Sequence, residues 1–270
     1  MSTSLRQAAI SALNAGNLDE KMKLTRAALV DWKAQRLSLR DPRDAPIPDQ
    51  PGRPAKPLLV PPTEVKKRSL KSEKGRIALL HALAHIELNA IDLALDIVAR
   101  FATEPVPRSF FDSWMGVADD EARHFSLLRH RLAELGAAYG DLPAHNGLWE
   151  AARETSEALH ARLAIVPLVL EARGLDVTQS MVAQLEAAGD HASARILKII
   201  YEDEKTHVAV GAKWFRFYCL RSREKPAEAF QALVKRHFRG PLKPPFNDLA
   251  RAAAGVTPSF YRSLCASSRS

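Results

Sequence analysis

Apolar residues along most of this chain recur every three or four positions, the spacing of one face of an α-helix, and strand-like alternation is scarce. The first 40 residues predict two short amphipathic helices broken near Gly16-Asn17, the second with Leu24, Ala28 and Trp32 on one face. After Lys66 the pattern stays helical for about 150 residues. The sequence therefore predicts an all-α protein.

Capping and helix-breaking residues divide the long helical stretch into four helices. We expect the first from about Ser72 to Phe101 and the second from Ser109, a candidate N-cap, to about Gly136. The third should begin after Asn146-Gly147 and the fourth after Gly189-Asp190. The section therefore looks like one helical hairpin used twice.

Proline-rich segments flank this helical section. Eight prolines from Pro42 to Pro62 exclude helix and strand and predict an extended arm, and Leu58, Leu59 and Val60 favour an arm docked on the following domain. The segment Gly240–Asn247 contains three prolines and should end the helices and wrap the bundle. We therefore expect N-terminal helices and arm in residues 1–65, a helical bundle in 66–222 and a packed tail in 223–270.

The chain has 270 residues, 46% of them hydrophobic, which is enough for a sizeable core. Cys219 and Cys265 are too few for a disulfide framework and form no Cys-x-x-Cys pair, which favours reduced thiols in a cytoplasm. No basic leader precedes an apolar stretch, and no apolar run reaches about 18 residues. We therefore expect a cytoplasmic protein without a membrane span.

The formal net charge of +8 favours anionic partners such as RNA, phosphorylated metabolites or a membrane surface. The excess is diffuse, and its one dense run is Lys66–Arg76. A solvated start of a helix explains that run more simply than a binding surface, and no recognised RNA module accompanies it. The charge leaves RNA open as a substrate beside a small molecule.

The strongest chemical signal is a repeated Asp-Glu-x-x-His motif. Residues three apart share a helix face, so each copy aims one carboxylate and one imidazole in the same direction. Chance would produce on the order of 0.03 copies per chain, so two copies predict a metal site. The predicted ligands are Glu121, His124, Glu204 and His207, and the preceding Asp120 and Asp203 are candidates to hold the second ring nitrogen of a ligating histidine.

A third Glu-x-x-His, from Glu157 to His160, lacks the preceding aspartate. It lies 14 residues before Glu171, about 21 Å away along a straight helix, and its neighbours are more polar. We therefore assign Glu157 and His160 to a solvated surface.

A di-metal site on four helices needs a further glutamate from each of the other two helices. Glu87 precedes Glu121 by 34 residues with a turn about midway, so an antiparallel pair places both carboxylates at one level. Glu171 precedes Glu204 by 33 residues and should meet it in the same way. Pro167 should kink the helix one turn before Glu171, either for packing or as an opening for substrate or oxygen.

Four carboxylates and two imidazoles suit iron or manganese, whereas structural zinc more often uses cysteine. We expect two iron ions, and manganese or a mixed iron–manganese pair would suit the same ligands. Tyr201, one turn before Glu204, is a candidate to reach the metal's surroundings and serve redox chemistry, with an ordinary buried tyrosine as the alternative.

With Glu, Glu-x-x-His, Glu and Glu-x-x-His on four helices, residues 72–220 resemble the ferritin-like di-iron superfamily. The segments 81–92, 170–176 and Pro51-Gly-Arg-Pro54 resemble the family called domain of unknown function 455, and the arrangement is more distantly similar to the tRNA hydroxylase that acts on a modified adenosine. Arg123 occupies Asp-Glu-x-Arg-His as in di-iron monooxygenases and is a further candidate neighbour of the metals, whereas the second motif has Thr206 there. The resemblance implies a ferritin-like four-helix bundle with the ligands Glu87, Glu121, His124, Glu171, Glu204 and His207.

The function expected from this site is that of a non-haem di-iron oxidoreductase, which activates dioxygen to hydroxylate or otherwise oxidise a small molecule or tRNA. An external reductase would supply electrons, and the chain would be a monomer or dimer. A tRNA-modifying hydroxylase, a metal-storing or peroxide-detoxifying ferritin-like protein and a metal-free scaffold remain as alternatives. Dioxygen uptake that depends on an organic compound would separate the oxidoreductases from the last two.

Overall fold

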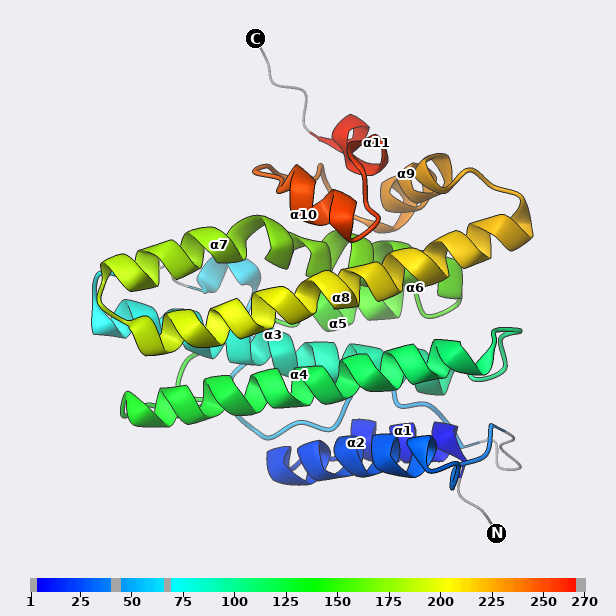
Figure 1. The fold of residues 1–270 in the computed structure, drawn as a ribbon. Helices are drawn as coiled ribbons and strands as arrows, with labels where there is room; N and C mark the ends of the chain where they lie inside the picture. The colour runs from blue at the N-terminus through cyan, green and yellow to red at the C-terminus, as the bar shows by residue number, and fades with distance from the viewer. Residues whose placement is uncertain (1–3, 40–44, 66–68, 266–270) are drawn as a thin grey trace. The chain divides into compact units, whose positions relative to one another are not determined.

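The structure, a computed structural model, describes residues 4–39, 45–65 and 69–265 (Figure 1). Within these residues the regular elements are helices, and extended pairing is limited to isolated bridges, so the all-α prediction is confirmed. The chain divides into two compact units, Met1–Trp149 and Glu150–Ser270. The expected domain boundaries after residues 65 and 222 stay predictions. None of the described helices is long and apolar enough to cross a membrane.

The first unit opens with a short helical hairpin, α1 (Leu5–Asn14) and α2 (Leu18–Lys33). The side chains of Ser4 and Asn17 each accept a hydrogen bond from a backbone N–H in the first turn of the helix that follows them. These caps fix the break that the sequence predicted. The hairpin buries Leu13 and Trp32, and it packs α1 on α3 and α2 on α4.

A second, longer hairpin in the same unit consists of α3 (Glu73–Arg100) and α4 (Arg108–Glu134), which pack closely against each other. The Ser72 side chain caps α3, so the predicted helix from Ser72 to Phe101 is confirmed. The predicted N-cap Ser109 is wrong, because α4 begins at Arg108 with Pro107 as its cap residue. Pro107 has the extended backbone (φ −72°, ψ 160°) that a cap residue needs, which leaves Ser109 inside the first turn.

The proline-rich arm is docked on the first unit, as predicted, but Leu58 and Leu59 do not hold it there. The side chains of Leu58 and Leu59 are 71% and 43% exposed. The arm is held by backbone hydrogen bonds, in which Val60 N donates to Ala144 O and Ala144 N donates to Leu58 O, by the side chain of Arg53, and by the buried Pro51 and Pro57. The arm ends in a short 3-10 turn, η1 (Pro62–Glu64). Lys66, Lys67 and Arg68 of the basic run lie outside the described residues.

Buried charges tie the hairpin α1–α2 and the arm to α3. The ammonium of Lys21 lies 2.6 Å from Asp92 Oδ1, and both side chains are almost fully buried. Arg53 Nη2 lies 3.4 Å from Asp92 Oδ2 and donates to Asn89 Oδ1 at 2.6 Å. Because a buried charge is costly without partners, this network fixes how these segments meet.

The second unit is also helical, and it contains a long hairpin formed by α7 (Ala172–Ala187) and α8 (His191–Ser222). Asp190 caps α8, which confirms the predicted start of the fourth helix. The other elements are α6 (Leu159–Ile165), a π-helical segment η2 (Val166–Glu171), α9 (Pro226–His237), α10 (Asp248–Ala253), α11 (Pro258–Tyr261) and η3 (Arg262–Leu264). α5 (Gly147–Glu154) runs across the boundary of the two units.

The third predicted helix is broken, although the sequence suggested a continuous one. α5 ends at Glu154, and α6 starts only at Leu159. Arg162 fixes the break because its buried guanidinium donates to Thr155 Oγ1 at 2.9 Å and to Ala152 O at 2.6 Å. These bonds tie the end of α5 to the start of α6.

The distortion predicted at Pro167 is confirmed, and it takes the form of the π-helical segment η2. η2 packs on α8, where Gly211 lies directly opposite the proline ring. A Cβ at position 211 would lie 2.4 Å from Pro167 Cβ. The glycine therefore allows the distorted helix to approach α8 closely.

We expect Gly211→Ala to lower the free energy of unfolding by about 1–3 kcal/mol, because the rigid ring of Pro167 cannot move out of the way of the new methyl group. Urea unfolding followed by tryptophan fluorescence would measure the change. Gly116→Ala in α4 is the control, since nothing lies within 4 Å of its added Cβ. Equal stability of the two variants would show that Pro167 does not constrain position 211.

The C-terminal segment packs within the second unit on α7 and α8. Both guanidinium nitrogens Nε and Nη2 of Arg251 on α10 lie 2.7 Å from the carboxylate of Asp176 on α7, and the two side chains are buried. Asn247, the cap of α10, donates through its backbone N to Asp176 Oδ1. A buried bidentate pair of this kind fixes the segment in one position.

Candidate metal centre

Three predicted ligands meet inside the hairpin α3–α4. Glu87 lies near the middle of α3, and Glu121 and His124 lie one turn apart on α4. The exposed fractions of the three residues are 3%, 0% and 0%. One potential ligand atom of each of these three side chains lies within 4.8 Å of a potential ligand atom of each of the other two. The expected meeting of Glu87 and Glu121 at one level is therefore confirmed.

His124 lies between the two carboxylates. Its Nδ1 is 3.2 Å from Glu87 Oε2 and 3.3 Å from Glu121 Oε2. Burial, followed by the negative charge of Glu121, raises the pKa of Glu87 well above its ordinary value. Burial alone would lower the pKa of His124, but hydrogen bonds and charges from Glu121 and Glu87 outweigh it and raise that pKa to about 11. Carboxylates crowded away from water in this way favour a bound cation.

Asp120 and Arg123 lie at the edge of this cluster, and both side chains are 42% exposed. Arg123 Nη2 lies 3.4 Å from Asp120 Oδ1. The guanidinium therefore partly balances the aspartate on the same helix. The expected role of Asp120 in orienting a ligating histidine, and that of Arg123 beside the metals, stay predictions.

The second unit contains the other three predicted ligands. Glu204 and His207 lie on α8, with His207 Nδ1 3.9 Å from Glu204 Oε1, and both are buried. Glu171 is the last residue of η2, which packs on α8, and it is half-buried. A Cβ on Gly174 would lie 3.9 Å from Glu204 Cγ, so the first turn of α7 also approaches this part of α8. The expected contact between Glu171 and Glu204 stays a prediction.

Two further predicted neighbours lie on α8. Tyr201 is buried, and its hydroxyl accepts a hydrogen bond from Asn247 Nδ2 at 3.1 Å. This bond orients the phenol toward the cap of α10. Asp203 is half-buried. The proposed parts of Tyr201 and Asp203 near a metal stay predictions.

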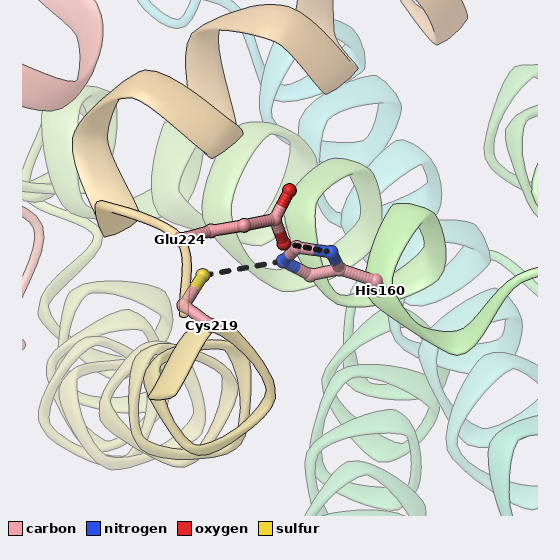
Figure 2. A group of neighbouring side chains, drawn as sticks. All are labelled: His160, Cys219 and Glu224. Atoms are coloured by element: carbon pink, nitrogen blue, oxygen red, sulfur yellow. Dashed lines mark hydrogen bonds and ion pairs between the residues drawn. The ribbon is translucent and has the colours of Figure 1, made fainter. Parts of the chain in front are cut away.

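The prediction that Glu157 and His160 lie on a solvated surface is right for Glu157 and wrong for His160. Glu157 is exposed, but the side chain of His160 is only 13% exposed. The helix break separates the two residues, so they share no helical face. His160 instead lies 3.3 Å from Cys219 Sγ, a neighbour 59 residues away that sequence spacing did not indicate (Figure 2).

The fold and the cluster on α3 and α4 define an all-α protein with buried glutamate and histidine side chains that can hold a metal ion. The chain belongs to the family described as protein of unknown function (DUF455), whose family model matches residues 14–262. It is 39% identical over 255 residues to a protein of Haemophilus influenzae described as uncharacterized, and the alignment covers 92% of this chain and 88% of the relative. No solved structure matches the chain significantly.

Proposed function

We propose that this protein is a non-haem di-iron oxidoreductase that uses dioxygen to hydroxylate or otherwise oxidise an organic substrate. The observation that carries the proposal is the meeting of Glu87, Glu121 and His124 in the buried interior of the hairpin α3–α4. The proposed ligands are Glu87, Glu121, His124, Glu171, Glu204 and His207.

The chemistry of this donor set fits two divalent ions. Four carboxylates carry four negative charges, which two ions of charge +2 balance, while two neutral imidazoles complete the set. Oxygen and imidazole nitrogen suit iron and manganese, and the set contains no thiolate of the kind that structural zinc sites favour. Iron is therefore the proposed metal, with manganese or a mixed pair as the nearest alternative.

The second set of ligands supports the proposal because it repeats the first. α8 presents Glu204 and His207 three residues apart, as α4 presents Glu121 and His124. Each pair is preceded along the chain by one more glutamate, at a spacing of 34 residues in the first set and 33 in the second. The proposal that both sets serve one centre rests on this matched spacing and on the pattern of four-helix di-metal proteins.

When bound, two iron ions supply the electron-transfer and Lewis-acid chemistry that oxidation by dioxygen requires. The chain's own part is to hold the ligands and to exclude water. Leu88 and Ile91 on α3 and Phe125 on α4 are fully buried beside the carboxylates along their helices. Apolar surroundings of this kind strengthen the interaction of carboxylates with a cation.

The π-helical segment η2 gives the second set a feature typical of functional helices. π-helical turns are rare, and they occur frequently at functional sites. This one ends at Glu171, a proposed ligand. The distortion changes the direction of that carboxylate relative to a regular helix, which favours the functional interpretation of Pro167 over packing alone.

The substrate is left open between a small molecule and tRNA. The resemblance to the ferritin-like di-iron superfamily supports the reaction class. The more distant resemblance to the tRNA hydroxylase and the net charge of +8 both keep tRNA as a candidate substrate. We propose a cytoplasmic enzyme that receives electrons from a separate reductase. Retention of tRNA on a filter at low salt would support the tRNA alternative, and its absence would remove it.

Metal analysis combined with Mössbauer spectroscopy tests the proposal directly. Full-length protein from iron-replete cells should contain about two iron ions per chain, coupled antiferromagnetically as expected for a pair held in one four-helix site. Zinc alone, or no metal, would overturn the di-iron assignment. Rapid oxidation of added iron or loss of peroxide without any organic substrate would identify a storage or detoxifying protein instead.

A further inference from the structure

A second group of metal-ligating side chains lies entirely within the second unit, apart from the six proposed ligands. His160 is on α6, Cys219 lies in the last turn of α8, and Glu224 follows the end of α8. Arg223 has a left-handed backbone (φ 59°), and Glu224 N donates to Cys219 O at 2.9 Å. This reversal of the chain turns Glu224 back over the helix end, and Figure 2 shows the three side chains converging.

We propose that His160, Cys219 and Glu224 form a binding site for a divalent cation of the zinc class. One ligand atom from each residue lies within 4.8 Å of one from each of the other two. His160 Nε2 is 3.3 Å from Cys219 Sγ. Two such ligands on one tetrahedral zinc ion, with bonds of about 2.0 and 2.3 Å, would be about 3.5 Å apart. The observed spacing therefore already fits an ion between imidazole and sulfur.

Two of the three ligands are held rigidly in place. The His160 ring packs on the rings of Phe215 and Tyr218, with centroids 4.6 and 4.7 Å away. Cys219 is fully buried on α8. Such pre-organisation reduces the entropy that binding would otherwise cost.

Glu224 is the adjustable ligand. Its side chain is 47% exposed, and Glu224 Oε2 lies 3.6 Å from His160 Nδ1. The carboxylate must turn toward the ring nitrogen that faces Cys219, because an ion binds only one of the two. An exposed side chain makes that rotation at little cost, and its side of the site gives the ion a path from solvent.

Charge and donor type select the class of ion. A thiolate and a carboxylate together balance a charge of +2, and the imidazole binds as a neutral ligand. Sulfur and nitrogen donors suit zinc and its chemical analogue cobalt better than magnesium or calcium, which prefer oxygen. With three ligands from the chain, a water molecule would complete four-coordination.

The order Cys219, His160, Glu224 also resembles a nucleophilic triad, with sulfur at one ring nitrogen and carboxylate at the other. The buried position of Cys219 argues against that interpretation, because a substrate could not approach the sulfur. Burial, followed by the charge of Glu224, also raises the pKa of the Cys219 thiol to about 11. A cation that enters past the exposed side chain of Glu224 is small enough to reach the sulfur and replace the thiol proton.

Cobalt titration of the reduced, tag-free, full-length chain tests the site, because a thiolate bound to Co²⁺ gives a charge-transfer absorption in the near ultraviolet. The wild type and Cys265→Ser, the control for the other cysteine, should both show the band, and Zn²⁺ should remove it. Cys219→Ser should abolish it. His160→Gln and Glu224→Gln should weaken cobalt binding by at least about 10-fold.

Three results would overturn the proposal: no band at saturating cobalt, loss of the band in Cys265→Ser, or unchanged affinity in Glu224→Gln. Should Cys219→Ser fail to fold, X-ray absorption on the cobalt-loaded wild type gives the same answer, because a sulfur neighbour at about 2.3 Å supports the site and its absence rejects it. The proposed di-iron ligands contain no sulfur, so a band that persists in Cys265→Ser reports this site alone. Failure here and failure of the di-iron proposal are thus distinguishable.

Discussion

Glu121→Gln is expected to reduce bound iron from about two ions per chain to below one, and to lower substrate-dependent dioxygen uptake by more than about 100-fold. Glu121 is fully buried, and its Oε2 lies 3.3 Å from His124 Nδ1. The amide keeps the size of the side chain but removes the negative charge and one of the two acceptor oxygens. The fold should therefore survive while the metal site is lost.

Glu157→Gln is the matched control, because it makes the same chemical change in the third Glu-x-x-His, where the glutamate is exposed. Its iron content and dioxygen uptake should equal those of the wild type. Iron content is measured by elemental analysis, and circular dichroism checks that both variants are folded. If Glu121→Gln still bound two iron ions, Glu121 would not be a ligand, and the proposed set of six ligands would be wrong.

The cluster on α3 and α4 could be predicted because it depends on local geometry. Residues three apart share a helix face, which fixes Glu121 beside His124. The position of the turn between the two helices then determines which residue of α3 lies opposite, and counting along the chain identifies Glu87. When two regular helices are joined by a short turn, the number of residues between two positions predicts whether their side chains lie close together.

The same counting fails where a helix is interrupted. Thr155 and Arg162 stop and restart the third predicted helix, so positions before the break no longer predict which face carries His160. The cluster of His160 and Cys219 depends on packing between residues 59 positions apart, and no periodic pattern marks it. The contacts of the arm could not be predicted from an apolar pattern either, because they involve backbone groups and Arg53 rather than Leu58 or Leu59.

Asp92→Leu is expected to lower the free energy of unfolding by about 3–5 kcal/mol, because it leaves the ammonium of Lys21 buried without its counter-charge. Lys21 is fully buried, and apart from Asp92 its Nζ donates to the carbonyls of Ala12 and Leu13. Burial raises the pKa of Asp92 even though Lys21 and Arg53 favour its charged form. Desolvation of the carboxylate therefore offsets much of what the ion pair contributes.

The double variant Lys21→Met/Asp92→Leu should recover much of that loss, because it removes the two fully buried charges and fills the space with apolar side chains, while Arg53 keeps its bond to Asn89. The carbonyls that Lys21 leaves keep other partners, since Ala15 N donates to Ala12 O and Gly52 N donates to Leu13 O. Urea unfolding followed by tryptophan fluorescence measures both variants, with Lys33→Met on the exposed face of α2 as a control that should change stability by less than about 0.5 kcal/mol. A double variant as unstable as Asp92→Leu alone would mean that the ion pair itself stabilises the fold, and that the buried charges are more than a device for positioning α1, α2 and α3.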